Sequence, residues 1–65
     1  MKPKFKAGDY LVNKYSEDIQ KIFVKSLVLD VLNKPCYIVD YFDGEPPDMR
    51  SVTVIERYYK LDKDD

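Results

Sequence analysis

Residues 36–42 read CYIVDYF, and this stretch has the period-two alternation of a β-strand. Alternate side chains of a strand share a face, and the face without an acid carries Tyr37, Val39 and Tyr41. Because an aspartate is rarely buried, the face that holds Asp40 should point away from the core, and Phe42 with it. The sequence therefore predicts a strand whose core face is tyrosine and valine, with an outward phenylalanine at its end.

Residues 20–31 (QKIFVKSLVLDV) are rich in Val, Ile and Phe and predict a second strand, joined to the first by a turn at 33–35. The apolar positions change parity halfway along it, so we expect a β-bulge near Lys25 that brings both apolar sets to one side. A helix is the alternative, because three apolar residues recur at intervals of four: Phe23, Leu27 and Val31. The density of Val and Ile favours the strand.

Three shorter strands complete the predicted organisation, over residues 9–14, 49–54 and 59–61. A turn at Gly8 precedes the first of them, and an acidic loop stiffened by two prolines, 43–48 (DGEPPD), precedes the second. A single 3₁₀ turn over 55–59 should lead into the last strand. Residues 1–4 and 62–65 are expected to fray. The expected core is Phe5, Leu11, Ile22, Val24, Leu27, Leu29, Tyr37, Val39, Val52, Ile55 and Leu61.

Length and composition exclude several kinds of chemistry. The chain has 65 residues with 45% apolar content, which suits one domain over residues 1–65. It contains no histidine and one cysteine, Cys36, so neither a Cys/His zinc site nor a His-dependent nucleophile can be built within it. Its two glycines, Gly8 and Gly44, make no glycine-rich phosphate loop. We expect no enzyme activity, no cofactor and no metal site.

The expected location is the cytoplasm. A transmembrane helix needs about 20 apolar residues, and every apolar run in this chain is far shorter. The basic N-terminus is not followed by the apolar segment of a signal peptide. A single cysteine cannot form an internal disulfide, whereas small secreted domains usually carry several cysteines.

Three stretches carry a resemblance to a known family: residues 5–12 (FKAGDYLV), 37–40 (YIVD) and 54–61 (VIERYYKL). With five short strands and a turn-like helix before the last, they describe a small SH3-like barrel. The chain resembles the small SH3-like domains, KOW-like or Tudor-like, of phage and bacterial accessory proteins over about residues 4–61. In such domains the first of these stretches usually has a branched aliphatic residue at the position where this chain has Ala7. The resemblance implies an all-β fold, a five-stranded SH3-like barrel. The first hypothesis for the function is a non-enzymatic interaction module that binds a protein partner, in the host cytoplasm if phage-encoded.

Six aromatic residues are the candidate partner-binding side chains: Tyr10, Tyr15, Tyr41, Phe42, Tyr58 and Tyr59. Nine of the 65 residues are Phe or Tyr, and SH3-like barrels commonly bind ligands on an aromatic surface between loops. The alternative is that most of these rings only fill a small core. For a protein partner we expect Phe42 to contribute most, because hot spots favour large rigid side chains, with two loop acids steering a basic partner. The predicted site is Tyr15, Tyr41, Phe42, Asp43 and Glu45.

A nucleic-acid partner is the second hypothesis. The net charge is −1, but residues 1–25 carry six lysines and three acids, so the N-terminal part is basic. A phosphate-binding patch would then consist of Lys2, Lys4, Lys6 and Lys14. A third possibility is a structural subunit with no outside ligand, and the expected oligomeric state is a monomer or a weak homodimer.

Overall fold

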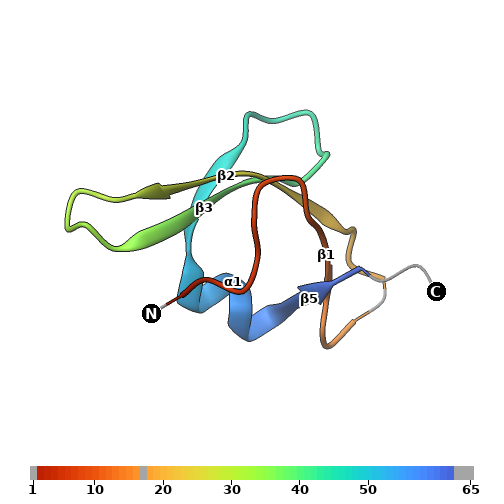
Figure 1. Cartoon of the computed structure of the whole chain (residues 1–65). Coiled ribbons are helices and arrows are strands. Elements are labelled where there is room, and N and C mark those ends of the chain that lie inside the picture. Colours follow the sequence, from red (N-terminus) through yellow and green to blue (C-terminus); the bar gives the residue numbers. More distant parts are fainter. Residues whose placement is uncertain (1, 17, 63–65) are drawn as a thin grey trace.

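The computed structural model describes residues 2–16 and 18–62, which form five β-strands and one α-helix (Figure 1). The helix α1 covers Val52–Tyr58. Neighbouring strands are antiparallel and form one sheet in the order β4-β3-β2-β1-β5. The strands are β1 (Tyr10–Asn13), β2 (Ile22–Leu29), β3 (Pro35–Asp40), β4 (Asp48–Ser51) and β5 (Tyr59–Leu61). The prediction of a mostly β chain with five strands is confirmed.

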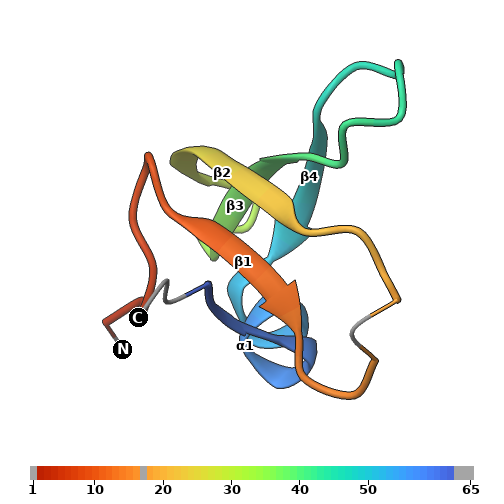
Figure 2. The same ribbon diagram turned by 90° about the vertical axis from the view of Figure 1, so that its right-hand side faces the viewer.

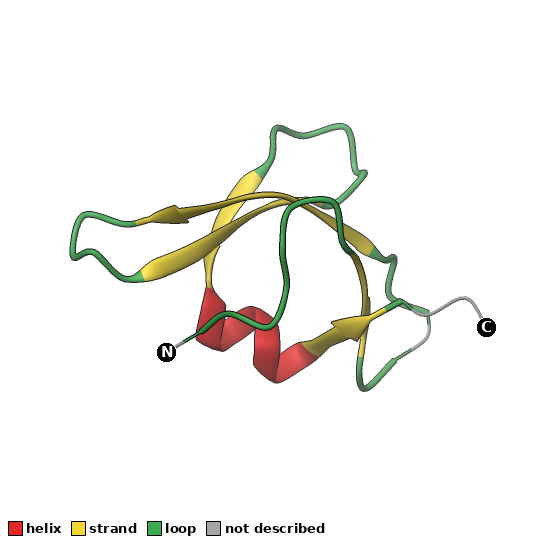
Figure 3. Cartoon of the chain, viewed as in Figure 1, coloured by secondary structure: helices red, strands yellow, loops and turns green. Residues whose placement is uncertain are grey.

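The core lies between the curved sheet and α1, which covers one side of it (Figures 2 and 3). β2 and β3 each contribute two alternate residues to this side, β1 contributes one, and α1 contributes two side chains one turn apart. The buried cluster is Phe5, Leu11, Ile22, Val24, Tyr37, Val39, Val52 and Ile55. All eight belong to the core that the sequence predicts. Cys36 is also buried, on the other face of β3.

The bulge predicted in β2 is present, and the segment is a strand rather than a helix. Val24 lies opposite Val39, whereas Ser26 lies opposite Ile38, so Lys25 is the extra residue on β2. The inserted residue turns the later apolar residues of β2 to the core face, because Leu27 then lies opposite the buried Tyr37.

Three residues of the predicted core are nevertheless exposed, and their prediction was wrong. Leu27 and Leu29 lie on the core face of β2, but the β2–β3 hairpin extends past α1, which therefore does not cover them (Figure 1). Leu61 lies opposite Leu11 on β5, which is an edge strand of the sheet, and it is also exposed.

The turn before β5 is a seven-residue α-helix, so the predicted 3₁₀ turn and the predicted strand end at 54 were both wrong. Ser51 is the last residue of β4, and its side chain caps the helix by accepting a hydrogen bond from the Val54 N–H. Val52 and Ile55 lie three residues apart, so both reach the core from one face of the helix. Packing of this face stabilises a helix that would be too short to persist alone.

The sheet is not closed into a barrel by hydrogen bonds. β4 and β5 are the two ends of the strand order, and within the described part of the chain no pairing joins them. α1 connects one edge strand to the other beneath the sheet (Figure 3).

Candidate protein-binding surface

Three aromatic rings meet on the outer face of β1 and β2. Tyr10 lies directly opposite Phe23, with ring centroids 4.8 Å apart, and the Phe42 ring stacks on Tyr10 at 6.3 Å and 10°. The neighbouring pair, Leu11 and Ile22, takes the core side of the same two strands, which turns Tyr10 and Phe23 outward. We call Tyr10, Phe23 and Phe42 the aromatic cluster.

Phe42 is placed by an unusual backbone conformation. β3 ends at Asp40, whose Oδ1 accepts a hydrogen bond from the Phe42 N–H at 2.8 Å, and Phe42 then has a φ of 58°. This left-handed region is unfavourable for a bulky L-residue. The strained conformation turns the Phe42 ring back onto Tyr10 rather than along the strand direction.

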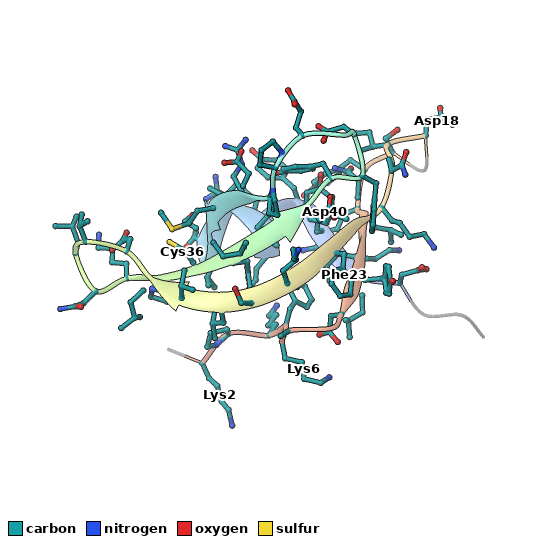
Figure 4. The ribbon with its side chains drawn as sticks, turned by 90° about the horizontal axis from the view of Figure 1, so that it is seen from above. Lys2, Lys6, Asp18, Phe23, Cys36 and Asp40 are labelled. Carbon is teal, nitrogen blue, oxygen red and sulfur yellow. The ribbon has the colours of Figure 1, made fainter. Side chains whose placement is uncertain are left out.

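The cluster remains open to solvent despite these contacts. Tyr10 is 47% exposed and Phe42 is 44% exposed, while Phe23 is half-buried. Figure 4 shows Phe23 and Asp40 at the same end of the β2–β3 pair, where the two residues lie opposite each other. The surface therefore offers both aromatic rings and a carboxylate.

Two further acids follow Phe42 in the loop at 41–47. Asp43 and Glu45 are both exposed, and the Glu45 N–H donates to Asp43 Oδ1 at 3.0 Å, which orders the start of the loop. We call Asp40, Asp43 and Glu45 the acidic rim. Phe42, Asp43 and Glu45 lie in the same exposed loop, as their closeness in the sequence requires.

Tyr41 has a different environment from Phe42. Its ring is half-buried and packs against the core, and its hydroxyl accepts a hydrogen bond from Arg50 Nε at 3.0 Å. The Arg50 guanidinium lies 5.9 Å from the Tyr41 ring centroid and forms an ion pair with Asp48 at 2.8 Å. The Tyr41 hydrogen bond is the main cause that raises the pKa of Arg50 further above its ordinary value.

Tyr15 lies on the other side of the molecule. It follows β1 in the loop that leads to β2, and this loop and the loop at 41–47 lie on opposite sides of the molecule (Figures 1 and 2). Its ring contacts Tyr58 edge-on at 6.1 Å. The structure does not bring Tyr15 together with the aromatic cluster.

The lysines of the alternative nucleic-acid patch have acidic and carbonyl neighbours. Lys6 pairs with Asp9 at 3.3 Å, and Lys14 Nζ donates to the Glu56 carbonyl at 2.8 Å. Lys4 and Lys14 line an open hollow that Glu56 and Asp62 also line. Lys2 and Lys6 extend to one side of the molecule, as Figure 4 shows. Lys4, Lys6 and Lys14 therefore have carboxylates close by, which weakens their attraction for phosphate.

A hydrogen-bond network beneath the sheet joins three segments of the chain. Tyr37 accepts a hydrogen bond from the Phe5 N–H at 3.1 Å and donates to Glu56 Oε2 at 2.9 Å, and the same carboxylate oxygen accepts from the Lys4 N–H. Burial is the main cause that raises the pKa of Tyr37 to about 12, and the Glu56 carboxylate adds to it. This network joins the N-terminal arm to β3 and α1, so its role is structural.

Two members of the cluster were not in the predicted site. The sequence makes Tyr10 one of six aromatic candidates, whereas Phe23 enters only through the strand or helix pattern of residues 20–31. The burial of Ile22 and Val24 on either side of Phe23 is the signal that turns its ring outward. No sequence signal places it beside Tyr10, because that depends on the β1–β2 register.

Searches against protein-family models, curated proteins and solved structures return no match to this chain. Among the described residues, no helix combines the length and apolar character that crossing a membrane requires. In the same part of the chain, His, Cys, Asp and Glu side chains do not gather in any group suited to a metal ion.

Proposed function

We propose that this protein is a non-enzymatic interaction module that binds a protein partner through the aromatic cluster and the acidic rim. The observation that carries the proposal is the exposed Phe42 ring, stacked on Tyr10 although its backbone is in an unfavourable conformation. A strained backbone conformation persists only where surrounding contacts hold it, and such residues cluster at functional sites. Large aromatic side chains dominate the binding energy of protein interfaces.

The chemistry of the surface indicates a basic partner segment. A Lys or Arg side chain that crosses Tyr10 and Phe42 would contact ring faces with its aliphatic stem and cationic group. Asp43 and Glu45 would attract the same side chain and mainly accelerate association. Weaker binding at higher salt is the expected consequence.

The fold assignment is part of the same proposal. Five antiparallel strands and a short helix before the last strand support an SH3-like module, with α1 in place of the 3₁₀ turn. We place it among small phage-like or bacterial accessory proteins. The single cysteine, buried in the fold, supports a cytoplasmic location.

The test is capture of partners from a native extract by the immobilised protein, with and without nuclease. Phe42→Ala should lose the captured protein, while Tyr15→Ala, which removes an exposed ring on the other side, should retain it. Far-UV circular dichroism and a chemical melt check that both variants fold.

Two results would overturn this proposal. Equal capture by the wild type and a folded Phe42→Ala would reject the aromatic cluster. Capture that nuclease abolishes, and that a double variant of Lys4 and Lys14 to Ala weakens, would establish the nucleic-acid function instead.

A further inference from the structure

The β2–β3 hairpin carries an apolar surface that the core does not use. Beyond the bulge Leu27 is 44% exposed and Leu29 is 63% exposed, and the turn that follows exposes Val31 and Leu32. The hairpin extends to one side past α1, with these residues in its outer part (Figure 1). Scattered exposed apolar residues are normal, but adjacent ones on one strand and its turn indicate a contact surface.

The backbone of the same segment has an open edge. β1 runs beside β2 only as far as Val24, which exchanges backbone hydrogen bonds with Gly8 and Asp9. The chain before Gly8 then turns beneath the sheet toward Tyr37. Within residues 2–16 and 18–62, no strand pairs with the outer edge of β2 over 25–29.

The hydrogen-bond pattern shows which groups face this edge. The Asp30 N–H donates to the Lys34 carbonyl at 2.9 Å, so Asp30 bonds toward the β3 side. Since antiparallel ladders alternate, the N–H and C=O groups of Leu27 and Leu29 point to the open edge. Their side chains share the face of Tyr37, which lies opposite Leu27.

We propose that this edge pairs with the same edge of a second copy of the chain, antiparallel, about a two-fold axis at Val28. In that register Leu27 of one copy lies opposite Leu29 of the other, and the two residues exchange backbone hydrogen bonds at both symmetry-related positions. About four such bonds form, and the leucines pack together on one face of the joined sheets. The two Val28 side chains meet on the other face.

The polar residues of the strand fit a second copy. β2 carries Lys25 and Ser26 before its apolar residues, and Asp30 follows them. In the antiparallel register Ser26 lies opposite Asp30 of the other copy, and Lys25 is next to that carboxylate. The same strand thus supplies both the lysine and the aspartate, so two copies complement each other as a two-fold interface requires. The net charge of −1 opposes association very little.

The size of the contact predicts a weak dimer. A standard stable interface covers about 800 Å² on each partner. The whole described surface is 4928 Å², and one strand edge with its flanking side chains covers only a small part of it. We therefore expect a monomer–dimer equilibrium at micromolar to millimolar protein concentration.

Sedimentation equilibrium over this concentration range tests the dimer. The wild type should show a monomer–dimer equilibrium. Leu29→Lys and Leu29→Pro should each weaken it at least about tenfold, because one places a charge at the edge and the other removes an outward N–H. Met49→Lys is the matched control, since Met49 is 50% exposed on β4, at the far edge of the sheet from this pairing, and it should dimerise like the wild type. Circular dichroism confirms folding of each variant.

A cysteine cross-link tests the register independently. With Cys36→Ala in the background, Val28→Cys should form an intermolecular disulfide on mild oxidation, because residues on the two-fold axis of a non-hydrogen-bonded pair have suitable Cα separation. Leu32→Cys in the same background is the control for random collision and should cross-link far more slowly.

Either experiment can overturn the proposal. A wild type that stays monomeric at millimolar concentration rejects it, and so does a dimer that folded Leu29→Lys leaves unchanged. Equal cross-linking of Val28→Cys and Leu32→Cys rejects the register. Phe42→Ala should dimerise normally, which separates this surface from the proposed partner-binding site.

Discussion

The Tyr37 hydroxyl donates a hydrogen bond to Glu56 Oε2 across 2.9 Å and so joins the middle of β3 to α1. The same hydroxyl accepts from the Phe5 N–H, and the same carboxylate oxygen accepts from the Lys4 N–H. The pair thereby fixes the N-terminal arm across the open side of the core. The surfaces proposed for binding depend on this arrangement, because the arm leads directly into β1 and Tyr10.

Tyr37→Phe should lower the free energy of unfolding by about 1–3 kcal/mol, because it leaves the buried Phe5 N–H without its acceptor. A urea melt of the variant beside the wild type measures the difference. A cost near zero would mean that water replaces the hydroxyl and that the arm is not held by this bond.

The pKa of Tyr37, raised to about 12, predicts a loss of stability at high pH. The ordinary tyrosine pKa is about 10, so ionisation favours the unfolded chain. The stability that comes from the neutral Tyr37 hydroxyl is fully present below a pH of about 10 and is lost as the pH rises through about 12. The measurement is the difference in unfolding free energy between the wild type and Tyr37→Phe across this range, which cancels the effect of other titrating groups. A difference that does not change with pH would contradict the raised pKa of Tyr37.

Phe42→Gly should abolish partner binding while changing the free energy of unfolding by no more than about 1 kcal/mol in either direction. Glycine adopts positive φ without strain, which offsets the lost contact of the ring with Tyr10. Phe42→Ala removes the same ring without relieving the strain, so it should be the less stable variant of the two. Urea melts and partner capture distinguish these effects. If Phe42→Ala is the more stable, the positive φ at position 42 does not strain the backbone.

Leu29→Ala should change stability by less than about 0.5 kcal/mol, because the side chain is mostly exposed in the monomer. Ile55→Ala, which truncates a buried side chain of α1, should cost about 2–5 kcal/mol. Both are measured by chemical denaturation at a concentration where the protein is monomeric. A cost for Leu29→Ala close to that for Ile55→Ala would show that something covers the hairpin.

Ser51→Ala should destabilise the protein by about 1 kcal/mol through loss of the cap on α1. Thr53→Ala is the matched control, because Thr53 is exposed within the same helix and alanine favours helix there. Thermal melts followed by circular dichroism should therefore move in opposite directions for the two variants. A shift of both in one direction would mean that Ser51 does not act as a cap.

The sequence by itself determined the strands and most of the core. Period-two alternation around Tyr37 and Val39, and the change of parity at Lys25, are local properties of the chain, and they are sufficient to define β3 and the bulge in β2. Phe42 is exposed, but the alternation does not set its direction: β3 ends at Asp40 rather than at the predicted residue 42, and the turn made by Asp40 and the positive φ of Phe42 orient the ring.

Only the tertiary structure decided which apolar residues are covered and which aromatic rings meet. Leu27 and Leu29 have the correct face for the core, yet burial requires an element opposite them, and α1 does not extend that far. Tyr10 and Phe23 become neighbours through the register of β1 on β2, which is set by long-range hydrogen bonds. Periodicity fixes the direction of a side chain relative to its own strand, whereas burial and contact depend on what the rest of the chain places against it.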